Sequence, residues 1–462
     1  MPNMSLQWTE QLQAIRKFYT TGVTLPYSFR KEQLKKLKSA ILRHQNELHE
    51  ALYTDLKKSP EESWITETGF VVSEINFALK KLGGWMHSQR LRTNLVNLPS
   101  SSRVIREPLG VVLIIAPWNY PLQLLVTPLV GAIAAGNCAV VKPSEFAPAT
   151  SAIMKKIIEE NFSSGYILFA EGDGAKVIPD MVENFRFDYI FYTGSNAVGK
   201  IIYKMAAEQL VPVTLELGGK SPCVVESDAH LVIAAKRITM TKFANAGQMC
   251  VAPDYVLVHS SVRDKFIGQM KECIVRFFSE DPSSSYNYCK IINEKQFRRL
   301  IDYLKDGVVV HGGRYNLDKL YLEPTLIEDV ASGASIMKEE IFGPILPIIP
   351  FDDFDEAAAV IDQNPNPLAF YIYTSSVEKE NRWLQRVPAG GSCVNNSSWH
   401  LTNYHLPFGG RGNSGFGEYH GRHSFETFSH RKAVLKSPTW FDPSIKYPPF
   451  KGKLWLFKKI VK

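Results

Sequence analysis

Hydrophobic positions in the first half of the chain fall into short continuous runs separated by longer amphipathic segments. Val111–Ile115 is apolar at every position, Cys138–Val141 is a second such run, and Leu122–Ala135 between them has the length of a crossover helix. Strands that are buried on both faces of a parallel sheet are apolar throughout, so the pattern predicts a βαβ unit. A membrane span is the alternative for this uncharged stretch, but four prolines between residues 108 and 128 argue against a continuous lipid-facing helix.

The same alternation of apolar runs and amphipathic segments continues beyond this unit. The expected elements are a helix over Thr150–Asn161, a strand over Tyr166–Ala170, a helix over Gly174–Val182, a strand over Tyr189–Tyr192, a helix over Ala197–Glu208 and a strand over Val213–Leu217. Strands and helices that alternate in this way predict a doubly wound parallel sheet, which binds nucleotides at the carboxyl ends of its strands.

A second α/β block follows the first. Its expected elements are helices over Leu231–Phe243, Val262–Phe278 and Asp355–Gln363, and strands over Tyr255–His259, Val308–Val310, Ile345–Ile349 and the region around Leu368–Thr374. The chain as a whole is therefore predicted to be of the α/β class with two sheets.

The two ends of the chain carry different patterns. Phe29–Asp55 and Glu61–Leu91 are amphipathic and predict an outer helical layer in which we see no chemistry. Asn94–Arg106 alternates apolar and polar positions around a serine-rich turn, which is typical of an exposed β-hairpin, and Phe425–Ser429 is a further strand candidate. Residues 441–462 mix apolar residues with lysines, and this basic-apolar tail is a candidate for peripheral contact with a membrane surface.

Composition narrows the class of protein. The 462 residues carry a net charge of +7, with 45% hydrophobic and 21% charged residues, as in an ordinary soluble globular protein. Lysines and arginines are scattered, so nucleic-acid binding is not expected. The six cysteines form no C-x-x-C pair, which argues against structural zinc, and we expect no metal site. Scattered thiols and an N-terminus without a signal-peptide pattern favour a reducing, cytoplasmic location.

One cysteine lies in a segment of unusual composition, Phe243–Pro253. Gly247 permits backbone conformations that other residues avoid, and Pro253 prevents a helix from continuing. Cys250 is therefore expected at the end of a helical turn or in a tight loop, where backbone N–H dipoles would lower the pKa of its thiol and make it reactive. The alternative is a small buried hydrophobe, which is the commoner fate of a free cysteine.

Two loops after predicted strands have the composition of ligand loops. Asn119, followed by a proline two positions later, is able to hold its amide N–H₂ toward a ligand oxygen, and the alternative is an ordinary turn asparagine. Lys142 and Glu145 are suited to bonding the hydroxyls of a nucleotide ribose, and a lysine there tolerates a 2′-phosphate. The alternative for this second loop is a solvated turn in which Ser144 caps the next helix.

Two further loops end the predicted strands of the first block. Gly194 and Ser195 open a helix and are suited to close approach of a pyrophosphate, although Gly194 and Gly199 do not form a G-x-G-x-x-G motif. Glu216 lies between two leucines, a setting that raises a carboxyl pKa and suits a general base. The alternative is a strand glutamate paired with a lysine, but the double glycine after Leu217 favours the approach of another chain segment or a ligand.

Taken together, seven segments in this order resemble the aldehyde dehydrogenase superfamily over about residues 10 to 440, and class 3, the fatty and aromatic aldehyde dehydrogenases, most closely. The segments are Trp118–Pro121, Lys142–Glu145, Phe191–Gly199, Leu215–Lys220, Phe243–Pro253, Glu339–Pro344 and Pro407–Gly410.

The resemblance implies a fold and a division of the chain. A doubly wound cofactor domain would comprise residues 1–90 and 107–216, an α/β catalytic domain residues 217–417, and an oligomerisation β-ribbon residues 91–106 and 418–440. It also implies a homodimer joined through this ribbon, and a cofactor that is NAD or NADP.

The resemblance further implies the reaction and its residues. Cys250 would attack the aldehyde carbon to give a thiohemiacetal, with the oxyanion held by Asn119 and the N–H of Cys250. Hydride transfer to the nicotinamide would leave a thioester, and Glu216 would activate water to hydrolyse it to the carboxylic acid. Met249, where many relatives carry Thr or Ile, is expected to line the substrate channel and favour apolar aldehydes.

The expected cofactor contacts come from the same motifs. Glu340 would hold the nicotinamide ribose and Phe342 would pack near the nicotinamide. Lys142 and Glu145 would contact the adenosine ribose, and the pyrophosphate would lie at the helix that Ser195 opens. The other members of the expected cofactor site are Trp118, Ser144, Gly194, Gly199 and Leu217.

Two other functions compete with aldehyde oxidation. Superfamily relatives that make or reduce acyl-CoA or acyl phosphates usually lack the general-base glutamate, so Glu216 argues against them. A non-catalytic binding protein with the same fold is disfavoured because Cys250, Glu216 and Asn119 occur together.

Overall fold

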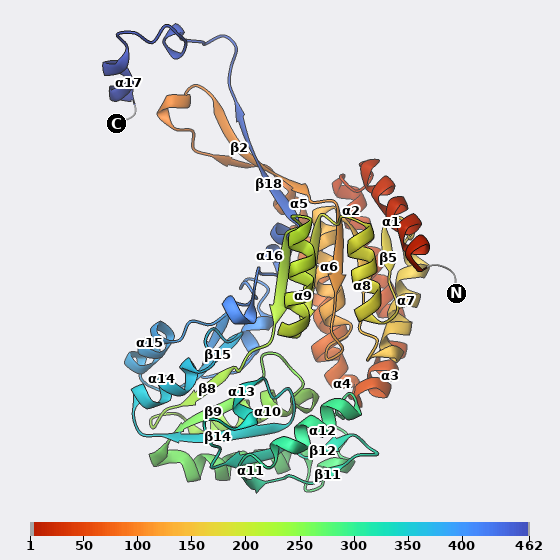
Figure 1. The fold of residues 1–462 in the computed structure, drawn as a ribbon, viewed down its shortest axis with the longest axis vertical. Coiled ribbons are helices and arrows are strands. Elements are labelled where there is room, and N and C mark those ends of the chain that lie inside the picture. The colour runs from red at the N-terminus through yellow and green to blue at the C-terminus, as the bar shows by residue number, and fades with distance from the viewer. Residues whose placement is uncertain (1–3, 461–462) are drawn as a thin grey trace.

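Two sheets with flanking helices form the body of the molecule, and an antiparallel ribbon projects from it (Figure 1). The computed structural model describes residues 4–460 of the chain. The predicted α/β class with two main sheets is confirmed.

The first sheet has the strand order β17-β7-β6-β3-β4-β5. Its strands are β3 (Val111–Ile115), β4 (Cys138–Lys142), β5 (Ile167–Phe169), β6 (Tyr189–Gly194), β7 (Val213–Leu217) and β17 (Gly415–Phe416). All are parallel except β17, which runs antiparallel to β7. The chain winds from β3 through β4 to β5 and then returns to the other side of β3 for β6 and β7, so the predicted doubly wound sheet is confirmed. Its topological switch point lies between β3 and β6.

The uncharged stretch forms the centre of this sheet and its first crossover. Every residue of β3 and β4 is buried, and so is every residue of α6 (Gln123–Ala135) between them. The helix ends at Gly136, whose φ of 92° lies in the left-handed region that favours glycine. Nowhere in residues 4–460 does a helix combine the length and the apolar character needed to cross a membrane.

Helices flank the first sheet, several of them from the N-terminal segment. They are α1 (Met4–Thr20), α2 (Tyr27–Arg43), α3 (Gln45–Leu56), α4 (Pro60–Ser63), α5 (Gly69–Met86), α7 (Pro148–Asn161), α8 (Gly174–Asn184) and α9 (Asn196–Glu208). The single helix predicted over Phe29–Asp55 is divided at His44, whose ψ of 13° interrupts the helical geometry. The helix predicted over Glu61–Leu91 contains a π-helical turn, Trp64–Thr68, and its last residues form a strand instead.

The second sheet has the strand order β10-β13-β14-β9-β8-β15-β16, and only β10 is antiparallel to its neighbour. Its strands are β8 (Pro222–Val225), β9 (Tyr255–His259), β10 (Val308–His311), β13 (Thr325–Glu328), β14 (Ile345–Phe351), β15 (Ala369–Tyr373) and β16 (Gly391–Val394). The helices of this block are α10 (Leu231–Phe243), α11 (Arg263–Phe278), α12 (Glu294–Tyr303), α13 (Ser335–Lys338), α14 (Phe354–Asp362) and α15 (Val377–Arg386), and a small hairpin pairs β11 (Tyr315–Asn316) with β12 (Tyr321–Leu322).

The projecting ribbon consists of β1 (Gln89–Leu91), β2 (Ser101–Pro108) and β18 (Ser429–Lys436), with β2 in the middle. The exposed hairpin expected at Asn94–Arg106 is present, although its first strand lies earlier, at β1. The strand expected at Phe425–Ser429 is wrong, because Phe425 lies in α16 (Gly421–Thr427) and is 1% exposed, and β18 begins only at Ser429. The chain then runs into the short helix α17 (Leu454–Ile460).

Candidate active site

Loops that follow strands of the first sheet contact loops that precede strands of the second sheet. Asn119, which follows β3, donates a hydrogen bond from Nδ2 to the carbonyl oxygen of Gln248 over 3.0 Å, and Gln248 lies in the loop before β9. The ring of Trp118 meets the ring of Phe342, which precedes β14, edge to face at 5.4 Å between centroids. Residues from these distant parts of the sequence therefore converge beside the switch point of the first sheet.

The cysteine loop is a tight turn in which three consecutive residues have left-handed backbone conformations. Asn245 and Ala246 have φ angles of 49° and 51°, and Gly247 follows with a φ of 74°. A Cβ atom on Gly247 would lie 2.2 Å from the carbonyl oxygen of Gly343, so only glycine fits against that neighbouring loop. The predicted tight loop is confirmed, and Cys250 is half-buried at its end.

The thiol of Cys250 does not have the lowered pKa that we predicted. Burial raises the pKa of this thiol, and the carboxyl groups of Glu340 and Glu216 raise it further. The backbone N–H groups of Cys250 and Val251 oppose this shift, but desolvation of the thiolate outweighs them. The sulfur is therefore protonated at neutral pH in this structure, and a nearby base is needed to make it nucleophilic.

Glu216 is the buried, unpaired carboxyl group that the sequence predicted. It lies in β7 and is 3% exposed, and neither carboxyl oxygen has a hydrogen-bond partner within residues 4–460. Burial raises its pKa well above the usual value of 4.5. The alternative, a glutamate paired with a lysine, is wrong, since its side chain makes no ion pair within the described residues. A buried carboxylate without partners is a stronger base than an exposed one, which suits a general base.

Asn119 presents its amide toward the cysteine loop. The residue is 2% exposed, and its Oδ1 atom has no hydrogen-bond partner among the described residues. One N–H of the amide is bound to Gln248, two positions before Cys250, which leaves the second N–H for another acceptor. This arrangement favours the ligand-holding interpretation over an ordinary turn asparagine.

Glu340 occupies space that Gly218 leaves open. A Cβ atom on Gly218 would lie 1.8 Å from Oε2 of Glu340, so the double glycine admits this carboxyl group rather than a side chain of its own. Burial raises the pKa of Glu340 well above its usual value, Asp254 raises it further, and Lys220 opposes the shift. Phe342 beside it has a φ of 50°, which turns the loop sharply toward Trp118.

The Lys142 loop carries a buried cation. The Nζ atom of Lys142 donates to the carbonyl oxygen of Pro143 at 2.6 Å and to Oε2 of Glu145 at 3.3 Å, and burial lowers the pKa of this ammonium group. Glu145 accepts from the N–H of Gly174 at 3.1 Å with its other oxygen. Ser144 does not cap the next helix, because its hydroxyl accepts from Phe146 within the turn and α7 begins at Pro148.

The loop after β6 opens α9, as predicted. Ser195 caps this helix by accepting from the N–H of Val198 at 3.5 Å. Gly199 packs against the neighbouring strand, since a Cβ atom there would lie 2.7 Å from Cδ2 of Leu217. Gly194 directly precedes the cap, and a Cβ atom on it would lie 2.3 Å from the hydroxyl oxygen of Tyr192. Free N–H groups at the start of α9 thus lie at the carboxyl edge of the sheet.

A second group of buried polar residues, beside Asn119, was not predicted from the sequence. Lys58 and Glu67 lie in the N-terminal helical layer, both are fully buried, and Lys58 contacts the Asn119 loop. Their residue types are typical of a solvated helix surface, so only their tertiary burial distinguishes them. Within residues 4–460 no cluster of three or more His, Cys, Asp or Glu side chains is arranged to hold a metal ion.

Comparison with known proteins gives matches over nearly the whole chain. The model of the Aldehyde dehydrogenase family matches residues 9–434. The 4,4'-diaponeurosporen-aldehyde dehydrogenase of Staphylococcus aureus is 44% identical over 449 residues, which cover 97% of each protein. Aldehyde dehydrogenase family 3 member B1 of Homo sapiens is 42% identical over 442 residues, 95% of this chain and 94% of the human protein.

Solved structures agree with these matches. A substrate-bound state of Staphylococcus aureus AldH superposes with a TM-score of 0.95 at 43% identity, covering 98% of this chain and 99% of that chain. An NAD-dependent aldehyde dehydrogenase from Sinorhizobium meliloti has a TM-score of 0.86 at 28% identity, covering 95% and 88%. Glyceraldehyde-3-phosphate dehydrogenase GapN from Methanocaldococcus jannaschii, complexed with NADP, has a TM-score of 0.84 at 25% identity, covering 94% and 95%.

Proposed function

Because the chain belongs to the aldehyde dehydrogenase family, we propose that Cys250, Asn119 and Glu216 carry out the oxidation of an aldehyde to a carboxylic acid. The protein is an oxidoreductase that acts on aldehydes with NAD or NADP. The observation that carries the residue assignment is the convergence of three segments: the amide of Asn119 is tied to the cysteine loop, and the charge of Glu216 acts on Cys250.

The residues at the switch point fit a dinucleotide. The start of α9 offers N–H groups at the carboxyl edge of the sheet, and the buried hydroxyl of Thr193 just before it has no partner among the described residues. Lys142 and Glu145 would hold the adenosine ribose, and Glu340 the nicotinamide ribose. The buried ammonium group of Lys142 is compatible with either a hydroxyl or a phosphate at the 2′ position. When bound, NAD(P)⁺ accepts the hydride that the substrate carbon loses.

Carbon–sulfur bond formation begins with loss of the thiol proton of Cys250. Glu216 and Glu340 are the carboxyl groups whose charges act on this thiol, so they are the candidate acceptors of its proton. The sulfur then forms a bond to the aldehyde carbon, and the carbonyl oxygen becomes an oxyanion that the free N–H of Asn119 and the N–H of Cys250 stabilise.

Hydrolysis of the resulting thioester depends on Glu216. After hydride loss the acyl group remains on Cys250. The proton taken from the thiol passes to solvent before this step, so that Glu216 is a carboxylate again. Glu216 then removes a proton from a water molecule, whose oxygen forms the new bond to the acyl carbon. The carbon–sulfur bond breaks to release the acid, and the thiolate of Cys250 takes the proton back from Glu216. Burial raises the pKa of Glu216, which makes its carboxylate a stronger base for this proton transfer.

The aldehyde is proposed to be apolar, aliphatic of medium or long chain, or aromatic. Tyr419 is fully buried, and its pKa is raised by burial first and then by the charges of Glu216 and Cys250, which supports a place for its ring in the substrate site. Its ring packs edge to face on Phe191 and Phe408. Met249, half-buried against the core, directly precedes the cysteine.

We also propose that the protein is a cytoplasmic homodimer that joins through the ribbon. The outer edge of β18 has no strand partner within the described residues, and an exposed edge of this kind is suited to pairing with a second copy. Six free cysteines fit a reducing compartment.

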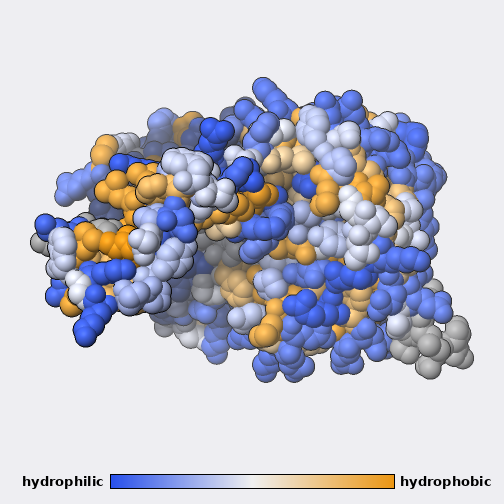
Figure 2. Space-filling model, turned by 90° about the horizontal axis from the view of Figure 1, so that it is seen from above, coloured by the Kyte–Doolittle hydropathy of each residue, from blue (hydrophilic) through white to orange (hydrophobic). Residues whose placement is uncertain are grey.

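The tail beyond the ribbon is proposed to touch anionic lipid. Figure 2 shows apolar side chains on this part of the molecule, and Leu454 and Trp455 are 64% and 61% exposed. Co-sedimentation with anionic vesicles, compared with uncharged ones, tests this contact, and equal recovery with both kinds of vesicle would contradict it.

The experiment that tests the assignment is Cys250→Ala. We expect no aldehyde-dependent formation of reduced cofactor, while binding of NAD⁺, measured by calorimetry, is kept because the sulfur is not among the proposed cofactor contacts. Retained turnover with octanal or benzaldehyde would remove Cys250 from the nucleophile role.

A further inference from the structure

Two opposite charges are fully buried in the N-terminal helical layer. Nζ of Lys58, just after α3, donates to Oε1 of Glu67 over 2.8 Å, and both side chains are 0% exposed. Burial of two charges costs free energy that their mutual attraction often fails to recover, so such a pair is weak support for stability by itself. What the pair contacts is therefore informative.

Both members of the pair hold the loop that carries Asn119. The ammonium group of Lys58 also contacts the backbone carbonyl oxygen of Asn119 at 3.4 Å, and it lies 4.2 Å from the ring centroid of Tyr120. The second oxygen of Glu67 accepts from the backbone N–H of Gln123 at 2.8 Å. The pair thus fixes the loop near its start and at the beginning of α6.

The same carbonyl oxygen of Asn119 is bound from the cysteine loop. Nδ2 of Asn245 donates to it over 2.8 Å and also to the carbonyl oxygen of Gln248 over 3.2 Å. That second carbonyl is the acceptor of the Asn119 amide. Three side chains and two carbonyl oxygens therefore form one closed network that sets the position of Asn119 relative to the cysteine loop.

The helical layer also reaches the cysteine loop directly. Oε1 of Glu62 accepts from the backbone N–H of Asn245 over 2.8 Å, at the residue where the loop enters its left-handed conformation. Since Glu62 and Lys58 belong to one short stretch of chain, this stretch braces both loops at once.

We propose that Lys58 and Glu67 are positioning residues for the oxyanion site, which hold the backbone of Asn119 so that its amide keeps its place beside Cys250. This inference rests on the role proposed above for Asn119. The pair acts through Asn119 and touches neither substrate nor sulfur, so its effect belongs to the hydride-forming half of the reaction and not to cofactor binding.

The test is a double-mutant cycle on the single-turnover rate of reduced-cofactor formation, with octanal and saturating NAD⁺. Lys58→Met with Glu67→Gln removes both charges together, keeps the side-chain volumes and leaves an acceptor for the N–H of Gln123. We expect the rate to fall about 10- to 100-fold, as small misplacements of catalytic groups do, with the dissociation constant for NAD⁺ unchanged. In an Asn119→Ala background the same pair of substitutions should change the rate by less than about twofold, because the group that it positions is already gone.

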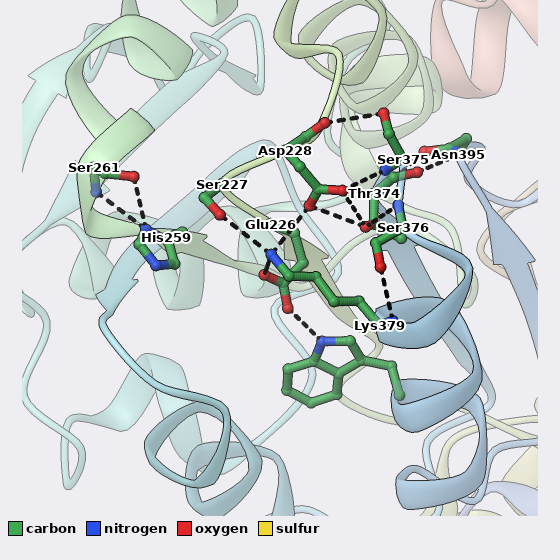
Figure 3. Close-up of polar contacts among 11 residues, drawn as sticks. Glu226, Ser227, Asp228, His259, Ser261, Thr374, Ser375, Ser376, Lys379 and Asn395 are labelled. Atoms are coloured by element: carbon green, nitrogen blue, oxygen red, sulfur yellow. Dashed lines mark hydrogen bonds and ion pairs between the residues drawn. The ribbon is translucent and has the colours of Figure 1, made fainter.

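A second Lys–Glu ion pair, at the carboxyl ends of β8 and β15, serves as the control. Nζ of Lys379 binds Oε2 of Glu226 at 2.8 Å in the cluster that follows β8 and β15, where both oxygens of Glu226 are satisfied (Figure 3). Lys379→Met with Glu226→Gln should leave the single-turnover rate within about twofold in both backgrounds.

The outcomes distinguish the oxyanion role proposed for Asn119 from the positioning role proposed for Lys58 and Glu67. If Asn119→Ala reacts at the wild-type rate, the oxyanion role fails and the positioning role fails with it. If Asn119→Ala is slow but the Lys58 and Glu67 double variant is not, the proposed function stands and the positioning role is overturned. Equal losses in both backgrounds also overturn it, because the pair would then act elsewhere.

Should the double variant not fold, Glu67→Gln alone decides the question in the same cycle. It keeps the size of the side chain and its acceptor oxygen. A loss of about threefold or more that disappears in the Asn119→Ala background supports the proposal, and a loss that persists there overturns it.

Discussion

At the scale of single residues, the structure places groups in states that are costly for folding and useful for chemistry. Glu216 is buried with both carboxyl oxygens unpaired, and Cys250 is a thiol whose pKa is raised by burial and by nearby carboxyl groups. Buried polar groups without partners are rare in folded proteins, and they concentrate at functional sites. The cost of these groups is measurable as a pH-dependent loss of stability.

Glu216→Gln is expected to stabilise the protein, increasingly so as pH rises. The pKa of Glu216 is higher in the folded protein than the usual 4.5, so burial adds no pH-dependent cost below that pH. Above it the carboxyl group ionises in the unfolded chain while it stays protonated in the folded one, which destabilises the native state increasingly until the raised pKa is reached. We expect the variant to gain about 1–3 kcal/mol in the free energy of unfolding at pH 8, because Gln does not ionise in the unfolded chain, and less at pH 5. Chemical denaturation of both proteins at the two pH values measures the difference, and a gain that shrinks with rising pH would contradict the unpaired state of this carboxyl group.

At the scale of elements, the loop that precedes β14 packs against a glycine that follows β7 of the first sheet. The carboxyl group of Glu340 lies so close to Gly218 that a methyl group there would overlap with it. Because Glu340 is the proposed ligand of the nicotinamide ribose, cofactor binding should depend on this glycine.

Gly218→Ala is therefore expected to displace Glu340 and to raise the KM for NAD⁺ by about tenfold, the equivalent of one lost hydrogen bond. Gly268→Ala in α11 is the control, because a Cβ atom there meets nothing within 4 Å. An unchanged KM in Gly218→Ala would mean that Glu340 does not hold the cofactor.

The sequence predicted the limits of those elements in which the hydrophobic pattern and the residues at both ends agree. The limits of β3, β7, β9 and α10 match the predicted ranges, because continuous apolar runs and a clear helical period end at Gly, Pro or polar residues. The strand expected at Phe425–Ser429 failed because a local apolar run does not distinguish a strand from a helix packed on α6. β8 and β16 were missed because each has only four residues and begins with Pro222 or Gly391, which are weak strand formers.

The sequence predicted the site residues that belong to recognisable motifs. It did not predict the properties that depend on burial in the folded protein. Cys250, Glu216 and Asn119 stand beside glycines and prolines that mark special loops, so their types and spacing were informative. The direction of the Cys250 pKa was mispredicted, because burial depends on the loop before β14, more than 80 residues away in sequence. Lys58 and Glu67 carry no local signal at all, since a solvated helix has the same residue types.

At the scale of the whole molecule, the site lies between two sheets, while the ribbon projects away from both (Figure 1). β18 pairs with β2 along its full length, from Ser429 opposite Pro108 to Lys436 opposite Ser101, and its other edge has no strand partner within the described residues. A strand of eight residues with one open edge is long enough to add a second copy by backbone hydrogen bonds.

We therefore expect a dimer in solution. Sedimentation velocity over a range of protein concentrations should give the mass of two chains of 52.1 kDa, with no monomer at micromolar concentration. Removal of the tail after Lys436 should leave this mass ratio unchanged, because the pairing edge is kept. A monomer at all concentrations would contradict the role of the ribbon.

The central claim is that a covalent acyl group forms on Cys250 and that Glu216 is needed to remove it. Its most direct test is mass spectrometry of Glu216→Gln after mixing with octanal and NAD⁺. We predict one octanoyl group per chain on the peptide that contains Cys250, formed in equal amount to the burst of NADH, with steady-state turnover largely lost. A burst without an acyl group on Cys250, or steady-state turnover at the wild-type rate, would contradict the account.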